Sequence, residues 1–158
     1  MININFKLVH EDAVIPYKAH DGDLGLDIYP AFDFDYKEIE PGDTKLIPTG
    51  IKSSIPEEYS IVFKERSGLG SDGIKVSAGV IDSSYRGQWY VALYNTLDIP
   101  VVIAKYPSDF DEENIYIIDY SNAIAQGIII ENHMVNSNIV KDLDDTSRNE
   151  NGFASTDE

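Results

Sequence analysis

The segment richest in chemistry-bearing side chains spans residues 77–88 and reads SAGVIDSSYRGQ. Turn residues between two apolar runs favour a β-hairpin here, with Asp82 at its tip. The backbone N–H and C=O groups of a bent hairpin can pair with the edge of a planar base. A carboxylate at the tip can orient and deprotonate a water molecule. Because an Asp in a turn commonly serves only the turn itself, this segment alone does not define an enzyme.

The sequence excludes several other kinds of site. It has no GxxxxGK[ST] phosphate loop and no cysteine, so neither a thiolate metal site nor a disulfide framework is possible. His10, His20 and His133 lack the spacing of a zinc site. The acidic segment 21–27 resembles the start of a calcium loop, but Phe32 stands where a bidentate Glu is required. We therefore interpret that segment as a polar turn.

The chain is strongly acidic, with a formal net charge of −16 and only three arginines, Arg66, Arg86 and Arg148. A protein that binds duplex DNA or RNA needs a basic face, so nucleic acid is not an expected partner. A free nucleotide is also an anion. Its site would therefore need the few cations gathered in one place, or the help of a divalent metal ion.

The elements that must position these residues are strands. Period-two alternation and short apolar runs between turn residues predict strands at residues 2–8, 44–51, 59–64, 88–94, 115–118 and 123–130. Residues 67–72 could form a brief helix or an irregular loop. No long stretch with a 3.6-residue period and no internal repeat is present. The pattern predicts an all-β sandwich or barrel.

The length of 158 residues fits one domain, which we expect to be a β-barrel catalytic domain over residues 1–140. Residues 141–158 are polar, and we expect them to form a flexible C-terminal arm. This arm is either a frayed terminus or a segment that closes over a ligand, with Phe153 stacking on it. No apolar run reaches the roughly 20 residues of a membrane helix, and residues 1–6 do not resemble a signal peptide, so we expect a cytoplasmic protein without membrane contact.

Five short segments occur together in one order, and all three arginines lie inside them. They are GLDI at 25–28, RSGLG at 66–70, GVIDSSYRG at 79–87, IAQ at 124–126 and RNENGFAST at 148–156. Each segment is weak evidence alone, but the ordered set resembles the five motifs of the homotrimeric dUTPase family (deoxyuridine triphosphate pyrophosphatases). The resemblance covers residues 24–156.

The resemblance implies a β-barrel of jelly-roll type and a homotrimer in which each active site draws on all three subunits. Asp82 would be the general base, activating a water that attacks the α-phosphorus of dUTP to give dUMP and pyrophosphate. Tyr85 would pack against the deoxyribose and exclude a 2′-hydroxyl. The hairpin backbone around Gly79, Ile81 included, would pair with uracil.

The other implied residues serve the phosphates and the arm. The full implied substrate-binding set is Arg66, Ser67, Gly68, Gly79, Ile81, Tyr85, Gln126, Arg148, Phe153, Ser155 and Thr156. Ser67 and Gln126 would contact the phosphates, with Arg66 serving or bracing the same region. Arg148 and the two arm hydroxyls would hold the terminal phosphate, Phe153 would cap the base, and Asp27 would support the site. Mg²⁺ is implied on the triphosphate, held mainly by substrate phosphates and water.

The chain departs from the family pattern in three motifs. Asn122 and Ala123 replace an acid and an arginine before IAQ, which leaves trimer packing or site support open. Ser84 stands where a second acid is frequent. Residues 149, 151 and 154 are Asn, Asn and Ala in place of glycines, although Asn tolerates positive φ better than most residues.

An acidic segment near residues 100–119 adds about a dozen residues to the length expected of the family, at a place where loops carry added function. It contains Tyr106 and Phe110 among several acids. The segment is either a solvated, extended hairpin or a docking surface for a protein partner, as in some phage members that bind regulatory proteins. A regulatory member of the family acting through this segment is therefore an alternative to an enzyme alone.

A dCTP deaminase relative is a second alternative, because that enzyme shares the fold. Its catalytic glutamate would lie three residues before Asn95. Ala92 occupies that position, which argues against deamination.

Overall fold

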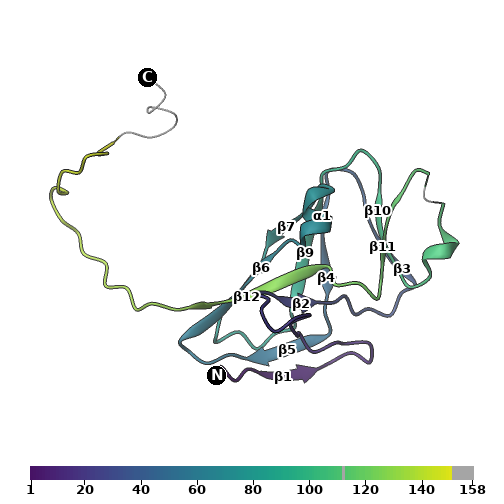
Figure 1. Ribbon diagram of the computed structural model, residues 1–158, viewed down its shortest axis with the longest axis horizontal. Helices are drawn as coiled ribbons and strands as arrows, with labels where there is room; N and C mark the ends of the chain where they lie inside the picture. Colours follow the sequence, from purple (N-terminus) through teal and green to yellow (C-terminus); the bar gives the residue numbers. More distant parts are fainter. Residues whose placement is uncertain (112, 151–158) are drawn as a thin grey trace.

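The computed structural model describes residues 1–111 and 113–150, and within them the chain is almost entirely β (Figure 1). The elements are β1 (Asn5–Leu8), β2 (Leu26–Ile28), β3 (Tyr36–Ile39), β4 (Thr44–Pro48), β5 (Ile51–Ser54), β6 (Tyr59–Lys64), α1 (Ser67–Ser71), β7 (Ile74–Ala78), β8 (Val80–Ile81), β9 (Tyr90–Asn95), β10 (Val101–Ala104), η1 (Pro107–Asp109), β11 (Tyr116–Asp119) and β12 (Ala125–Glu131). The expected all-β class is confirmed.

The strands form small sheets that enclose one apolar core. Their orders are β1-β5, β11-β10-β3, β2-β12-β6-β8 and β4-β9-β7. Trp89 lies fully buried in this core, with the ring centroids of Phe6 and Phe63 at 5.5 and 5.6 Å in edge-on geometry. Such edge-to-face contacts add to the free energy gained from burying the large rings. The core thus supports the strand ends that carry the candidate site.

The strand expected at 44–51 is two strands, β4 and β5, that belong to different sheets. The break falls at Gly50, whose φ of +66° ends the extended backbone. A side chain there would also collide, since a Cβ on Gly50 would lie 2.6 Å from the Cβ of His10 and 2.8 Å from that of Ala13. Gly50 therefore allows the chain to change sheets beneath a tightly packed loop.

We predict that Gly50→Ala lowers the free energy of unfolding by about 2–4 kcal/mol, because left-handed backbone strain and overpacking add together. Gly42→Ala is the matched control: Gly42 has a φ of +77° but nothing within 4 Å of an added Cβ. It should show only the backbone cost, about 1–2 kcal/mol. Urea unfolding at equal protein concentration measures both, and equal losses would contradict the packing argument.

The β-hairpin expected at 77–88 does not form within those bounds: the antiparallel pair is wider and joins β7 to β9, and the long connection between them carries Asp82. β7 pairs with β9, whereas β8 pairs with β6 in another sheet. The ladder of β7 shifts register between Val76 and Ala78, and the backbone N–H of Phe63 on β6 donates to the carbonyl of Gly79 at 2.7 Å. This long-range hydrogen bond draws the chain into the β6 sheet. Asp82 consequently lies on a turn that leaves a two-residue strand.

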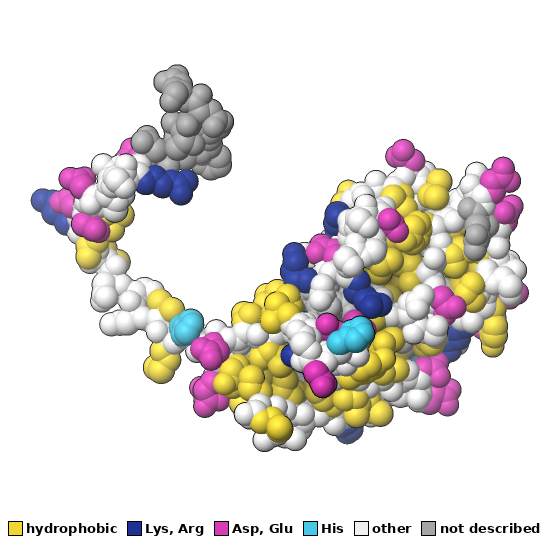
Figure 2. Space-filling view, viewed as in Figure 1, with side chains coloured by type: hydrophobic (Ala, Val, Ile, Leu, Met, Phe, Trp, Pro, Cys, Tyr) yellow, Lys and Arg dark blue, Asp and Glu magenta, His cyan; other side chains and the backbone are white. Residues whose placement is uncertain are grey.

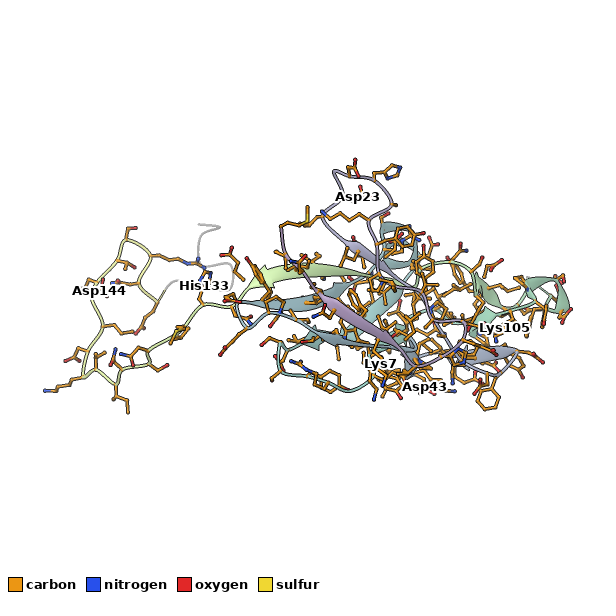
Figure 3. The ribbon with its side chains drawn as sticks, turned by 90° about the horizontal axis from the view of Figure 1, so that it is seen from below. Lys7, Asp23, Asp43, Lys105, His133 and Asp144 are labelled. Atoms are coloured by element: carbon orange, nitrogen blue, oxygen red, sulfur yellow. The ribbon has the colours of Figure 1, made fainter. Side chains whose placement is uncertain are left out.

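The extra segment near 100–119 is not a solvated hairpin. All four residues of β10 are buried in the core, and β10 and β11 run parallel to each other. The excursion at the surface is therefore confined to the connection between β10 and β11, described over residues 105–111 and 113–115. It begins at Lys105, whose Nζ donates to Asp12 Oδ2 at 2.9 Å. Figure 3 places Lys105 at this end of the molecule, opposite the C-terminal segment.

Residues 132–150 lead away from the body of the protein after β12 (Figure 1). Figure 3 shows His133 and Asp144 along this segment, and residues 133–150 are all exposed. Met134, Val135 and Ile139 are among its exposed apolar side chains, so the segment presents apolar surface that this one chain does not cover. Among the described residues, no helix is both long and apolar enough to cross a membrane.

Candidate active site

Three strands that are distant in the sequence bring Asp27, Arg66 and Gln126 together. In the sheet register, Gln126 on β12 lies opposite Asp27 on β2 and opposite Lys64 on β6. Arg66 lies two residues beyond the end of β6, and its Nε is 3.3 Å from Asp27 Oδ1. The Asp27 side chain is 13% exposed and that of Arg66 41%, so the carboxylate is held inside while the guanidinium reaches the surface. Asp27 therefore fixes the position of a cation at the rim.

Gln126 is fixed in place from both sides. Its Nε2 donates to the backbone carbonyl of Glu65 at 2.8 Å. Its side chain also lies directly on Gly25, where an added Cβ would collide with Gln126 Oε1. A glycine is thus required at position 25 for this close approach. Gly25 and Gln126 line a pocket of about 280 Å³ whose polar residues include Asp27, Arg66 and Ser67.

Ser67 and Gly68 begin the short helix α1 and are both exposed. Both line a second pocket of about 390 Å³, which shares Arg66 and Ser67 with the first. Ser67 is therefore placed at the junction of two hollows, where its hydroxyl can face a ligand. Residues 68–73 have the spacing GxGxxG, but they lie between β6 and β7, which belong to different sheets, and not in a βαβ unit, so this is no dinucleotide motif.

Cations gather around this part of the surface although the protein is acidic. Figure 2 shows lysine and arginine side chains in dark blue around α1, with acidic side chains in magenta among them. Lys64 contacts Glu65, and Lys75 donates to the carbonyl of Gly70 in α1. The pKa of Glu65 is lowered, first by its own backbone N–H and then by that of Val76. The Glu65 carboxylate stays charged and ties the connection between β6 and α1 to β7.

The turn that carries Asp82 is built from local hydrogen bonds. The backbone N–H of Tyr85 donates to the carbonyl of Asp82 at 3.1 Å, and Arg86 Nη1 donates to the carbonyl of Ser83 at 2.6 Å. The Tyr85 hydroxyl donates to the carbonyl of Gln88 at 3.0 Å, while its ring remains 43% exposed. Asp82 itself is exposed. The turn thus presents a carboxylate and an aromatic ring to the outside.

Within one chain, this turn and the Asp27–Arg66–Gln126 cluster do not meet. Neither pocket that Arg66 and Ser67 line contains any residue from 79 to 86. Arg86 instead lines a separate pocket with residues of β1 and β5. The residues expected to bind phosphate and the residues expected to hold the base and the water therefore face different directions.

The described residues contain no group of three or more His, Asp or Glu side chains that could hold a metal ion. Asp27, a carboxylate that lines the same pocket as Ser67 and Gln126, is paired with Arg66. This arrangement fits an Mg²⁺ ion that is bound by substrate phosphates and water and only supported by the protein.

The chain is similar over most of its length to known proteins of one family. A model of the family described as dUTPase matches residues 11–107. A deoxyuridine 5′-triphosphate nucleotidohydrolase from Clostridioides difficile is 33% identical over 99% of this chain and 99% of its own length. This chain belongs to the dUTPase family. A second dUTPase relative, from Alkaliphilus metalliredigens, is 35% identical over 99% of this chain and 98% of its own length.

Solved dUTPases from phages share the whole fold, the jelly-roll β-barrel of the family. A point mutant of the Staphylococcus phage 80alpha dUTPase with dUpNHpp has a TM-score of 0.78 and 24% identity, with 98% of each chain covered. A second point mutant of that dUTPase, from work linking enzymatic activity to SaPI-inducing capacity, has a TM-score of 0.77 and 25% identity, covering 97% of this chain and 98% of that one. A mutant dUTPase of phage phi11 of Staphylococcus aureus coordinates a structural Mg(II) ion; its TM-score is 0.72 at 23% identity, covering 89% of this chain and 97% of that one.

The dUTPase residues expected in the C-terminal arm are only partly described. Phe153, Ser155 and Thr156 lie outside the described residues. Arg148 is exposed in the segment that leaves β12. Asn149 adopts a φ of +41°, which is the backbone geometry a glycine would provide there, and it exchanges hydrogen bonds with Thr146 at 2.6 and 2.9 Å. Asn149 thus adopts the left-handed backbone for which a glycine was expected at this position.

Two side-chain pairs near the dUTPase motifs were not predicted. Tyr17 and Tyr29 stack beside Asp27 with their hydroxyl oxygens 2.8 Å apart, and burial, followed by this contact, raises the pKa of Tyr29 to about 12. Tyr116 on β11 bonds to Asp72 at the end of α1. No spacing signal in the sequence links either pair, because each depends on how separate segments of the chain pack against each other.

Proposed function

We propose that this chain hydrolyses dUTP to dUMP and pyrophosphate. The observation that carries the proposal is the full-length identity to dUTP nucleotidohydrolases, of 33% and 35%. The polar cluster beside Ser67 and the exposed carboxylate of Asp82 supply the groups that this reaction needs. The separate roles below are part of the same proposal.

Asp82 acts as the general base. Its carboxylate takes a proton from a water molecule while the water oxygen forms a bond to the α-phosphorus. The bond between the α-phosphorus and the bridging oxygen breaks, and the electron pair leaves with pyrophosphate. The exposed position of Asp82 suits this role, because the carboxylate can face a substrate held by another surface.

The phosphates are bound by Ser67, Gly68, Arg66 and Gln126. Arg66 uses Nε for Asp27, so both Nη groups can donate to phosphate oxygens in the fork geometry of a guanidinium. Arg148, with Ser155 and Thr156, adds contacts to the terminal phosphate. Mg²⁺ on the triphosphate spreads its charge and fixes its geometry when it is bound.

Tyr85 packs against the deoxyribose, and the backbone from Gly79 to Ile81 pairs with uracil. The Ile81 side chain is 6% exposed and belongs to the core, so only its backbone contributes to recognition. Phe153 caps the base. Backbone donors chosen for the uracil O4 would be left unpaired opposite a cytosine amino group, which is an effective way to reject dCTP.

The active site is shared between subunits of a homotrimer. Support comes from the separation of the Asp82 turn from the pockets of Arg66 and Ser67 within one chain. A neighbouring copy can place its turn against those pockets. The exposed apolar side chains of residues 132–150 suit a segment that continues over another copy toward a site.

A substrate panel tests the proposed function. Pyrophosphate release would be measured with dUTP, dCTP, dTTP and UTP in the presence of Mg²⁺. We expect dUTP to be hydrolysed with the highest kcat/KM, dCTP to be rejected at the base and UTP at Tyr85. Comparable efficiency with UTP would remove Tyr85 from its role, and preference for another base would overturn the assignment of dUTP. A deaminase would release ammonia from dCTP instead, an outcome that Ala92 at the expected glutamate position argues against.

Removal of residues 148–158 is expected to reduce kcat/KM for dUTP by at least about 10²-fold, because interactions that position the triphosphate are lost. The folded core should keep its unfolding midpoint, since residues 133–147 of the remaining tail are already exposed. Steady-state kinetics and thermal unfolding would be compared with a protein lacking only residues 157 and 158. Unchanged kinetics would show that the arm takes no part in turnover.

The exposed excursion at 105–115 favours a second activity, the binding of a protein partner. Tyr106 is 56% exposed, and Phe110 packs edge-on against Tyr36 at 5.1 Å to hold the excursion in shape. Deletion is a poor test, because parallel strands need a connection that returns along their length. The variant Tyr106→Ala, Asp109→Lys keeps the connection. Capture of a partner should be lost and dUTP hydrolysis kept; equal loss of both would contradict a separate binding role.

A further inference from the structure

Helix α1 lies across a cavity from β11, the strand that ends the extra segment. One wall of this cavity, about 390 Å³ in volume, is formed by Arg66, Ser67 and Asp72, and the facing wall by Tyr116 and the next two residues of β11. Its remaining lining includes Asn122 and Ala123, the positions where the family has an acid and an arginine. Neither residue brings a charged group that could hold α1 from below.

One hydrogen bond spans this cavity. The Tyr116 hydroxyl donates to Asp72 Oδ2 at 2.5 Å, and in the described part of the chain no other hydrogen bond joins β11 to α1. Asp72 caps the C-terminal end of α1, where its backbone N–H donates to the carbonyl of Gly68. Because α1 has only five residues, this hydrogen bond links Asp72 directly to the turn that begins with Ser67 and Gly68.

The hydrogen bond from Tyr116 also holds the charged Asp72 carboxylate in one orientation. Asp72 and Arg66 line one cavity, so a released Asp72 carboxylate could turn toward the Arg66 guanidinium and compete with a phosphate for it. In the structure, the Tyr116 hydroxyl donates to that carboxylate instead. Burial, followed by the contact with Asp72, raises the pKa of Tyr116 to about 12. The phenol therefore stays protonated and remains a hydrogen-bond donor at neutral pH.

We propose that Tyr116 is a positioning residue for triphosphate binding: by holding Asp72, it keeps Ser67 in place and leaves Arg66 available to phosphate. The proposal rests on the proposed function, since it concerns the same site. It gives the extra segment a role inside its own subunit, at the place where Asn122 and Ala123 lack the usual charged pair.

The test compares Tyr116→Phe with Tyr106→Phe in the full-length protein. The control removes the same atom from the same segment, and the Tyr106 hydroxyl makes no hydrogen bond to the described residues. We expect Tyr116→Phe to raise the Kd of dUpNHpp by about fivefold to tenfold, the upper part of the range for one ordinary hydrogen bond, because Tyr116 acts on the ligand only through Asp72. The Kd of deoxyuridine, which has no phosphate, should not change, and KM should rise more than kcat falls.

Two further measurements separate positioning from general stability. Tyr116→Phe should speed amide hydrogen exchange at Gly70 and Asp72, whose N–H groups close α1, while Tyr106→Phe should not. Adding Asp72→Asn to Tyr116→Phe removes the competing charge and should restore part of the dUpNHpp affinity. Equal weakening of deoxyuridine and dUpNHpp, or equal Kd values for both Phe variants, would overturn this inference alone. Failure of the unmodified protein to bind dUpNHpp would overturn the proposed function as well.

Discussion

Asp82→Asn is expected to lower kcat by at least ~10²-fold, because general-base catalysis typically contributes 10² to 10⁴. Asparagine keeps the size of the side chain but cannot accept a proton from water. The affinity for dUpNHpp should change little, since the phosphate-binding candidates Arg66, Ser67 and Gln126 lie on a different part of the chain. Single-turnover hydrolysis of dUTP and equilibrium binding of dUpNHpp would measure the two effects separately.

Asp43→Asn is the matched control, since Asp43 is also an exposed aspartate in a turn. Figure 3 places it far from Asp23, which lines the pocket of Arg66 and Gln126. Its kcat should equal that of the unmodified enzyme. A near-normal kcat for Asp82→Asn would remove Asp82 from the catalytic role. Loss of dUpNHpp binding together with kcat would instead indicate that the turn itself had been disturbed.

Mixing two inactive variants should restore activity if the site is shared between subunits. One variant carries Asp82→Asn and the other carries Ser67→Ala with Gln126→Ala, so each destroys a different side of the site. In randomly mixed trimers, roughly one quarter of the sites would combine an intact phosphate side with an intact turn from the neighbouring copy. Equal amounts refolded together should therefore approach about a quarter of the unmodified activity.

Each variant refolded alone supplies the baseline for this experiment. Gel filtration of the mixture would verify that the oligomer has re-formed. Activity no higher than the mean of the two separate variants would contradict a site shared between subunits, and would require the Asp82 turn to approach Arg66 within one chain.

The fold could be predicted where local pattern and burial agree. The strand expected at 59–64 is β6 with the same ends, because its short run of aromatic and β-branched residues supplies Ile61 and Phe63 to the core. β3 and β10 were missed for opposite reasons: β3 is mostly polar, and β10 is four buried residues without alternation. The hairpin at 77–88 was predicted incorrectly because β8 pairs with β6, which precedes it by many residues, and not with the segment that follows it in the chain.

The residues of the candidate site could be predicted from the sequence, but their contacts could not. The ordered motifs identified Asp27, Arg66 and Gln126, and the structure brings these three side chains together from separate strands. Sequence spacing could not show their contact, because it depends on the register of β12 between β2 and β6. For the same reason the bond between Tyr116 and Asp72 has no signature in the sequence.

The single tryptophan of this protein, Trp89, also provides an intrinsic fluorescence probe of folding. Trp89 is fully enclosed, with two phenylalanine rings edge-on to it and no polar partner for its indole nitrogen among the described residues. Its emission in the native state should be blue-shifted and inaccessible to iodide, and should move to longer wavelength only when water enters the barrel. Intrinsic fluorescence can therefore follow denaturation of every variant above without a label, largely undisturbed by nucleotides arriving at the rim.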